Sequence, residues 1–277
     1  MGFEVGMLVA ADPLAGPGGS GRVGAGERQR AIVGCAALAE QLGFDSLWLA
    51  GPHGPASAPA VVLAAIAART TRLRLGAELC LGEGLDPLRV AEDFATLDGI
   101  SAGRVELGIA TGRSDGESGE RLRESVALLR RLWSETEVTW SGRFRAALAG
   151  VTVEPRPVQQ PHPPLWIGGG AAAEAADLAG ELGLPLLLHE PSDDWEPLAG
   201  RYRDRAARAG HRARVGAAGP APGGSPAEAA AAILAARERL GLEVQLVRFD
   251  RGGLPEPELR EALARFGAAV LPLLRAA

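Results

Sequence analysis

The sequence predicts a single (β/α)8 barrel, with residues 1–277 forming one compact domain. Strand-like and helix-like segments alternate along the whole chain, which indicates a parallel sheet with helical connections. Eight such pairs close a barrel, and 277 residues is an ordinary length for that fold. The alternative is an open doubly wound sheet. It is disfavoured because the glycine-rich stretch 16–21 lies within a loop and not at a helix start.

The predicted strands are short apolar runs. In chain order they cover residues 3–9, 46–50, 73–79, 104–109, 165–167, 185–188, 213–217 and 244–247. Residues 153–164, rich in Pro and Gln, are predicted to be irregular. These eight segments therefore supply the eight strands of a barrel.

The predicted helices follow the strands and are recognised by their spacing and their start signals. Apolar residues recur at helical spacing in Ile32, Cys35, Ala36, Ala39 and Leu42. Asp86 followed by Pro87 is a helix start, and so is the capping box at 225–228. The remaining helices are expected at 61–69, up to 97, 121–133, 171–182, up to about 209, and 257–274.

Composition narrows the class of protein. The formal net charge of −5 argues against nucleic acid or an anionic membrane as a partner. No apolar run reaches the roughly 20 residues that cross a bilayer. No signal peptide precedes Phe3, and the two cysteines, Cys35 and Cys80, are too few for a disulfide framework. The sequence predicts a cytoplasmic protein with a small-molecule substrate and no metal site.

Three stretches resemble a known family. Residues 39–50 read AEQLGFDSLWLA, and residues 86–104 contain DPLRVAED and LDGISAGR. The most specific stretch is PRPVQQPHPPLWIGGG at 155–170. These segments resemble the luciferase-like monooxygenase family, and the likeness covers residues 26 to 183. The last third of the chain matches in pattern only.

The resemblance implies a cofactor and partners. Members of the family bind reduced FMN or a deazaflavin coenzyme at the carboxyl ends of the strands, and the cofactor carries the redox chemistry. A flavin reductase is then a possible partner. The resemblance also implies a homodimer, because relatives pair through helices on one side of the barrel. The segment 114–120 is shorter than the covering loop of relatives, which implies a more open site.

Two catalytic candidates follow the second and third strands. Where the family has Glu-His-His this chain has Gly51-Pro52-His53, so His53 is the remaining acid or base. The alternative is a loop histidine held by backbone. The family also has a non-prolyl cis peptide facing the flavin, which would fall between Ala77 and Glu78. Ala77 is then a cofactor contact and Glu78 an acid or base with a raised pKa, unless Glu78 faces solvent.

The expected phosphate site lies on two other strands. Thr111 stands where luciferases have an arginine, and Arg113 is a possible substitute. The fifth strand leads through glycines into a helix whose free N–H groups can bind an anion. Relatives often add a serine there, but this chain has alanine, so only backbone is left to hold a phosphate. The cofactor residues predicted on this connection are Gly168, Gly169, Gly170 and Ala171.

Polar side chains on the last strands complete the predicted site. His189 ends the sixth strand, and Arg248 and Asp250 end the eighth. All three are expected at the rim of the mouth or in contact with substrate.

Three functions are compatible with these residues. The first is a flavin- or deazaflavin-dependent oxidoreductase. The second is a cofactor-free barrel that uses His53 and Glu78 for acid–base chemistry. The third is a non-catalytic partner subunit. Fold alone does not decide between them, because the altered residues are at the site itself.

Overall fold

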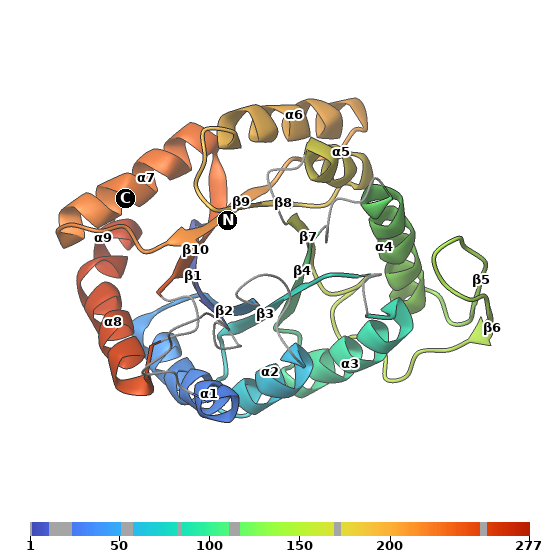
Figure 1. The fold of residues 1–277 in the computed structure, drawn as a ribbon, viewed down its shortest axis with the longest axis horizontal. Coiled ribbons are helices and arrows are strands. Elements are labelled where there is room, and N and C mark those ends of the chain that lie inside the picture. The colour runs from blue at the N-terminus through green and yellow to red at the C-terminus, as the bar shows by residue number, and fades with distance from the viewer. Residues whose placement is uncertain are drawn as a thin grey trace.

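The structure, a computed structural model, confirms the closed barrel. It describes residues 2–10, 24–50, 58–81, 85–110, 117–168, 173–249 and 254–277. Parallel strands pair around the barrel in the order β1-β10-β9-β8-β7-β4-β3-β2, so β1 and β2 close the ring and an open sheet is excluded. Figure 1 shows the helices as an outer ring around these strands.

The barrel strands lie close to the predicted segments. They are β1 (Glu4–Ala10), β2 (Ser46–Ala50), β3 (Arg74–Leu79), β4 (Val105–Ala110), β7 (Leu165–Gly168), β8 (Leu186–His189), β9 (Val215–Pro220) and β10 (Leu242–Arg248). Nearly every strand residue is buried, on the inner face against the other strands or on the outer face against helices. This explains why the strands are almost uniformly apolar in sequence.

The helices begin where the start signals predicted. The Asp86 side chain accepts a hydrogen bond from the Leu88 N–H at 3.0 Å, and Ser225 and Glu228 form the expected capping box. The helices are α1 (Ala25–Leu42), α2 (Pro59–Ala67), α3 (Pro87–Ile100), α4 (Ser118–Ser134), α5 (Ala173–Leu182), α6 (Trp195–Arg208), α7 (Pro226–Leu240), α8 (Glu256–Ala269) and α9 (Leu271–Arg275). Among the described residues, no helix is both long and apolar enough to cross a membrane.

Two strands were not predicted, and the single closing helix expected at 257–274 is divided into α8 and α9. Between α4 and β7 the chain forms a two-stranded antiparallel hairpin of β5 (Val138–Trp140) and β6 (Leu148–Val151), which projects beside α4 (Figure 1). Strands of three and four residues give too short a pattern to be recognised from sequence.

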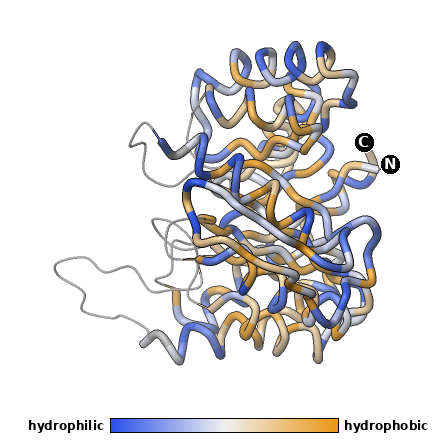
Figure 2. Tube along the Cα trace, turned by 90° about the vertical axis from the view of Figure 1, so that its right-hand side faces the viewer, coloured by the Kyte–Doolittle hydropathy of each residue, from blue (hydrophilic) through white to orange (hydrophobic). Residues whose placement is uncertain are grey.

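The two chain ends meet at the amino-terminal end of the barrel. Arg275 Nη1 donates to the Phe3 carbonyl at 2.8 Å, and its Nη2 donates to Asp45 Oδ2 at 2.6 Å. Figure 2 shows both ends on the same side of the molecule. It also shows hydrophobic and hydrophilic residues alternating along the helical coils.

Candidate functional site

Two tryptophans fill the middle of the barrel because neighbouring strands carry glycine. Alternate residues of each strand face inward, and the inward Trp48 and Trp166 are each 1% exposed. A Cβ on Gly76 would collide with the Trp48 ring, and one on Gly216 would lie 3.0 Å from the Trp166 ring. Gly108 is adjacent to Trp48 in the same way, at 3.1 Å. Large residues on some strands therefore require glycine on others.

The inward positions above the tryptophans, at the carboxyl ends of the strands, are mostly small. They are Ala10, Ala50, Ala110, Gly168 and Ala218. The larger inward side chains at this end are polar, and they come from Glu78, His189 and Arg248. Ligands of (β/α)8 barrels bind at this end. We call this end of the barrel, with these three side chains, the mouth.

Glu78 points into the barrel and not to solvent. Its side chain is 14% exposed, and a Cβ on Gly108, its register partner on β4, would lie 3.5 Å from Glu78 Cγ. Burial raises the pKa of Glu78, because a carboxylate loses hydration there. His189 and Arg248 oppose this rise in pKa, and Glu190 adds to it. Glu78 Oε1 is buried and has no hydrogen-bond partner in the described parts of the chain.

His189 lies across the mouth from Glu78. Its Nε2 atom is 3.4 Å from Glu78 Oε1, and its side chain is 17% exposed. Strands β3 and β8 are separated in the barrel by β4 and β7. The two side chains meet because these intervening strands carry Gly108 and Gly168. A Cβ on Gly168 would lie 2.9 Å from His189 Nε2.

Arg248 forms an ion pair with Glu190, the residue that follows His189. Arg248 Nη2 donates to Glu190 Oε2 at 2.9 Å, and Nη1 contacts the other carboxylate oxygen. Glu190 adopts φ of 52°, a left-handed conformation that non-glycine residues seldom adopt. The ion pair fixes the guanidinium beside the mouth, close enough to lower the pKa of Glu78.

The opposite end of the barrel interior holds a second buried glutamate. Glu106 is 5% exposed. It forms an ion pair with Arg74 and accepts a hydrogen bond from Trp166 Nε1 at 3.0 Å. The Arg214 guanidinium packs over the Trp166 ring, with Arg214 Cζ 5.4 Å from the ring centroid. We call this group the floor. It was missed from sequence, although Glu106 interrupts the apolar run of β4.

The structure places Glu78, His189 and Arg248 at the same end of the barrel, as the strand assignments predicted. Their roles in catalysis and substrate contact remain predictions. The expected cis peptide between Ala77 and Glu78 was wrong. The cis bonds among the described residues precede Pro155 and Pro161, and β3 pairs with β4 in unbroken register from Leu75 to Leu79. Ala77 is fully buried in the layer between sheet and helices, so its side chain faces away from the mouth.

Gly168 also makes room for His189, because it has no side chain. The sequence did not reveal this role. The other predicted site residues lie outside the described residues and remain predictions: His53, Thr111, Arg113, Gly169, Gly170, Ala171 and Asp250.

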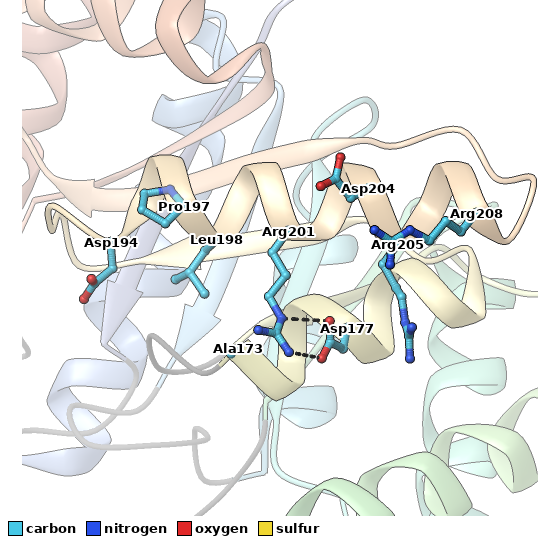
Figure 3. A pocket seen from close by; sticks show the side chains of 9 residues that line it. All are labelled: Ala173, Asp177, Asp194, Pro197, Leu198, Arg201, Asp204, Arg205 and Arg208. Atoms are coloured by element: carbon cyan, nitrogen blue, oxygen red, sulfur yellow. Dashed lines mark hydrogen bonds and ion pairs between the residues drawn. The ribbon is translucent and has the colours of Figure 1, made fainter.

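A large groove lies elsewhere, on the outside of the barrel between α5 and α6 (Figure 3). Its volume is about 900 Å³. Arg201 donates to both carboxylate oxygens of Asp177, at 2.8 and 2.5 Å, and Arg205 pairs with Glu181. Because three arginines and three aspartates line the groove, it offers no excess charge to a ligand. We therefore place the candidate site at the mouth.

The fold and the mouth together define a class, a (β/α)8-barrel protein with partly buried polar side chains where such barrels bind ligands. The sequence model of the family described as luciferase-like monooxygenase matches residues 4–265. The chain belongs to the luciferase-like monooxygenase family, which confirms the predicted resemblance.

Curated relatives include F420-dependent and flavin-dependent enzymes. F420-dependent glucose-6-phosphate dehydrogenase from Kineococcus radiotolerans is 35% identical over 155 residues, 49% of this chain and 45% of the relative. The oxygenase component of flavin-dependent trigonelline monooxygenase from Acinetobacter baylyi is 30% identical over 146 residues, 47% of this chain and 40% of the relative. The chain spans about half the length of the curated relatives it matches.

Solved structures match over the whole barrel. The monooxygenase RslO1 from Streptomyces bottropensis aligns with a TM-score of 0.84 at 25% identity, covering 98% of this chain and 99% of that chain. The F420-dependent tetrahydromethanopterin reductase from Methanopyrus kandleri aligns with a TM-score of 0.73 at 17% identity, again covering 98% and 99%. The second match shows a shared fold.

Proposed function

We propose that this chain is an oxidoreductase that uses reduced FMN or a deazaflavin to oxidise or reduce a small organic substrate. In this proposal Glu78 exchanges a proton with the substrate. The observation that carries it is the buried Glu78 carboxyl at the mouth, whose Oε1 lacks a hydrogen-bond partner among the described residues. A buried polar atom without a partner costs stability. Such a cost is typical of a group that is satisfied by a ligand.

The residues at the mouth fit a flat cofactor. Small inward residues at the carboxyl ends of β1, β2, β4 and β7 leave space for a ring, and Glu78 offers one polar group to it. We propose that Thr111, Arg113 and the backbone of Gly168 to Ala171 hold the phosphate, with the Ala77 backbone beside the ring. When bound, the flavin or deazaflavin supplies hydride transfer or, for reduced flavin, oxygen activation.

Titration with each cofactor tests the proposal. Reduced and oxidised FMN and a deazaflavin are added separately, and their absorption and fluorescence are followed. We expect binding weaker than in relatives by on the order of 10- to 1,000-fold, because a hydroxyl and an arginine are missing from the phosphate site. Ala171→Ser restores the hydroxyl and should tighten binding about 10-fold. Ala173→Ser, two residues further on, is the matched control. Absence of any binding would contradict the proposal.

A second function uses the same side chains without a cofactor. Because Glu78 and His189 lie together at the mouth, acid–base chemistry needs only these groups and His53. A protein that binds neither cofactor but loses turnover on Glu78→Gln would establish this alternative. A protein inactive in every assay, but required by another subunit, would establish a non-catalytic partner.

We propose a homodimer that pairs through α2 and α3. Every residue of α2 is apolar, including its outward face, which is typical of a helix covered on all sides. Val61 is 71% exposed and Ile100 is 58% exposed, and both line an apolar groove of about 510 Å³ between the two helices. A second copy, placed by a two-fold axis, would cover this groove with the same apolar surface.

Light scattering tests the dimer. Val61→Glu combined with Ile100→Glu should convert a dimer to a monomer at micromolar concentration. Val158→Glu is the matched control, because Val158 is 59% exposed but lies outside the groove. A wild-type monomer would contradict the dimer.

Two further proposals concern the redox partner of the protein and its location in the cell. Because the Acinetobacter relative is named as an oxygenase component, we propose that FMN, if it is the cofactor, is reduced by a separate flavin reductase. The buried Cys35 thiol forms no disulfide among the described residues, which supports a cytoplasmic location. Pull-down with a purified reductase and fractionation of cells, respectively, test these two statements.

A further inference from the structure

The juxtaposition of Glu78 and His189 depends on two missing side chains. The residues come from strands that are not neighbours, and any Cβ on Gly168 would press on His189 Nε2 at 2.9 Å. Gly108, directly beside Glu78, opens the path on β4. The two side chains can therefore approach each other only because the two intervening strands carry glycine at these positions.

The two groups are near each other but not yet hydrogen-bonded. The separation of 3.4 Å between Glu78 Oε1 and His189 Nε2 exceeds the usual range of roughly 2.7–3.2 Å for a hydrogen bond to oxygen. A small side-chain rotation would close it, and catalytic hydrogen bonds are often long before substrate binds. In contrast, Arg248 is already held by both oxygens of Glu190. His189 is thus the group positioned to exchange a proton with Glu78.

We propose that Glu78 and His189 form a proton relay, in which His189 takes the proton that Glu78 removes from the substrate. A proton that leaves an O–H or C–H group of the substrate is taken by the Glu78 carboxylate. It then passes to His189 Nε2 and is released to water, and the reverse order delivers a proton to substrate. No electrons are exchanged in the relay, because the redox equivalents belong to the cofactor. The identity of the substrate rests on the proposed function, whereas the relay itself does not.

In this relay Glu78 is the catalytic residue and His189 is a positioning residue that acts through it. The charges facing Glu78 are His189 on β8, Arg248 on β10 and Glu190 after β8. Of these three groups, His189 is the one whose ring nitrogen lies 3.4 Å from the partnerless oxygen of Glu78.

Carbon NMR of the cofactor-free protein tests the relay. The protein is labelled with ¹³C at the glutamate carboxyl carbons, and the Glu78 signal is assigned by its loss in Glu78→Gln. In the wild type we expect this signal to titrate above the ordinary value of 4.5, because burial raises the pKa of Glu78. His189→Asn removes the opposing charge, so the midpoint should move further upward. Gly168→Ala should move it in the same direction by displacing His189.

Two controls make the outcome decisive. Arg248→Met also removes a positive charge that lowers the pKa of Glu78, so it measures the upward shift that a lost charge produces while the contact with His189 is kept. Should His189→Asn fail to fold, Gly168→Ala provides the same comparison. A Glu78 titration that is identical in the wild type, His189→Asn and Gly168→Ala would overturn the relay. Because no cofactor is present, this result is independent of whether flavin or deazaflavin binds.

Discussion

Two glutamates face the interior of the same barrel from adjacent strands, and their surroundings differ completely. On the floor, Glu106 has an arginine on one oxygen and a tryptophan N–H on the other. At the mouth, Glu78 has a buried oxygen without a hydrogen-bond partner among the described residues, and a histidine 3.4 Å away. The first carboxylate is satisfied by the protein itself. The second is left to be satisfied by something that enters the barrel.

This comparison shows that burial of a carboxyl does not by itself identify a functional group. Both side chains are inward and largely buried, so burial alone would make both of them candidates for chemistry. Hydrogen-bond satisfaction separates them, because a fully paired carboxylate is typical of structural roles. An incompletely paired carboxyl with a raised pKa is typical of functional sites. Variants that remove one charge at a time should therefore behave in opposite ways.

The largest expected difference is in turnover. Glu78→Gln keeps the shape of the side chain but removes its titration, and we expect a loss of about 100-fold or more, the usual scale for general acid–base catalysis. Glu106→Gln should keep the turnover of each folded molecule, because Glu106 lies on the floor. Rates are measured at equal concentrations of folded protein. Unchanged turnover in Glu78→Gln would refute its catalytic role and leave His53 as the remaining candidate.

The next effect is the stability of the floor. In Glu106→Gln, the amide cannot accept hydrogen bonds from both Arg74 and Trp166, and the guanidinium loses its counter-charge. We expect the free energy of unfolding to fall by roughly 1–3 kcal/mol, less than for a fully buried pair, because Arg74 is 31% exposed. Urea denaturation at neutral pH measures the change. The matched variant Arg74→Met with Glu106→Gln should recover part of the loss.

The smallest effect is a gain in stability at the mouth. Because folding raises the pKa of Glu78, the folded protein binds this proton more tightly than the unfolded chain does. Ionisation therefore costs stability as pH rises from about 4.5 through the folded-state pKa. Glu78→Gln avoids this cost and should be more stable than the wild type by about 1 kcal/mol at pH 8.

Well below pH 4.5 the advantage of Glu78→Gln should disappear, because the carboxyl is protonated in both the folded and the unfolded states. Thermal unfolding of the two proteins across this pH range checks the prediction. A variant that is less stable than the wild type at pH 8 would show that the carboxylate is better solvated than the structure indicates.

The sequence predicted the fold well because barrel strands and helices have clear signatures. Uniform apolar strands such as Ser46–Ala50 were located to the residue, and the helix starts at Asp86 and Ser225 were recognised from their caps. The hairpin of β5 and β6 was not predicted, because its strands are too short to show a periodic pattern. The cis peptide at Ala77 was taken from the family, and strand β3 in this chain follows regular pairing instead.

The candidate site was predicted only as separate residues. A carboxyl in the apolar third strand marked Glu78, and position at strand ends marked His189 and Arg248. The contact between Glu78 and His189 depends on the register of four strands and on the absence of side chains at Gly108 and Gly168. One sequence cannot supply that information. For the same reason, the pairing of Glu106 with Arg74 and Trp166 became visible only in the closed barrel.

The two tryptophans packed against glycines inside the barrel can report binding at the mouth through their intrinsic fluorescence. Trp48 and Trp166 lie inside the barrel beneath the mouth, each 1% exposed. The indole N–H of Trp166 is bound to Glu106, whereas that of Trp48 is buried and has no hydrogen-bond partner among the described residues. Their emission should therefore differ in colour, with Trp48 the bluer of the two. A coloured ring that enters the mouth would be close enough to quench both by energy transfer, so occupancy can be followed in unlabelled protein by ultraviolet fluorescence alone.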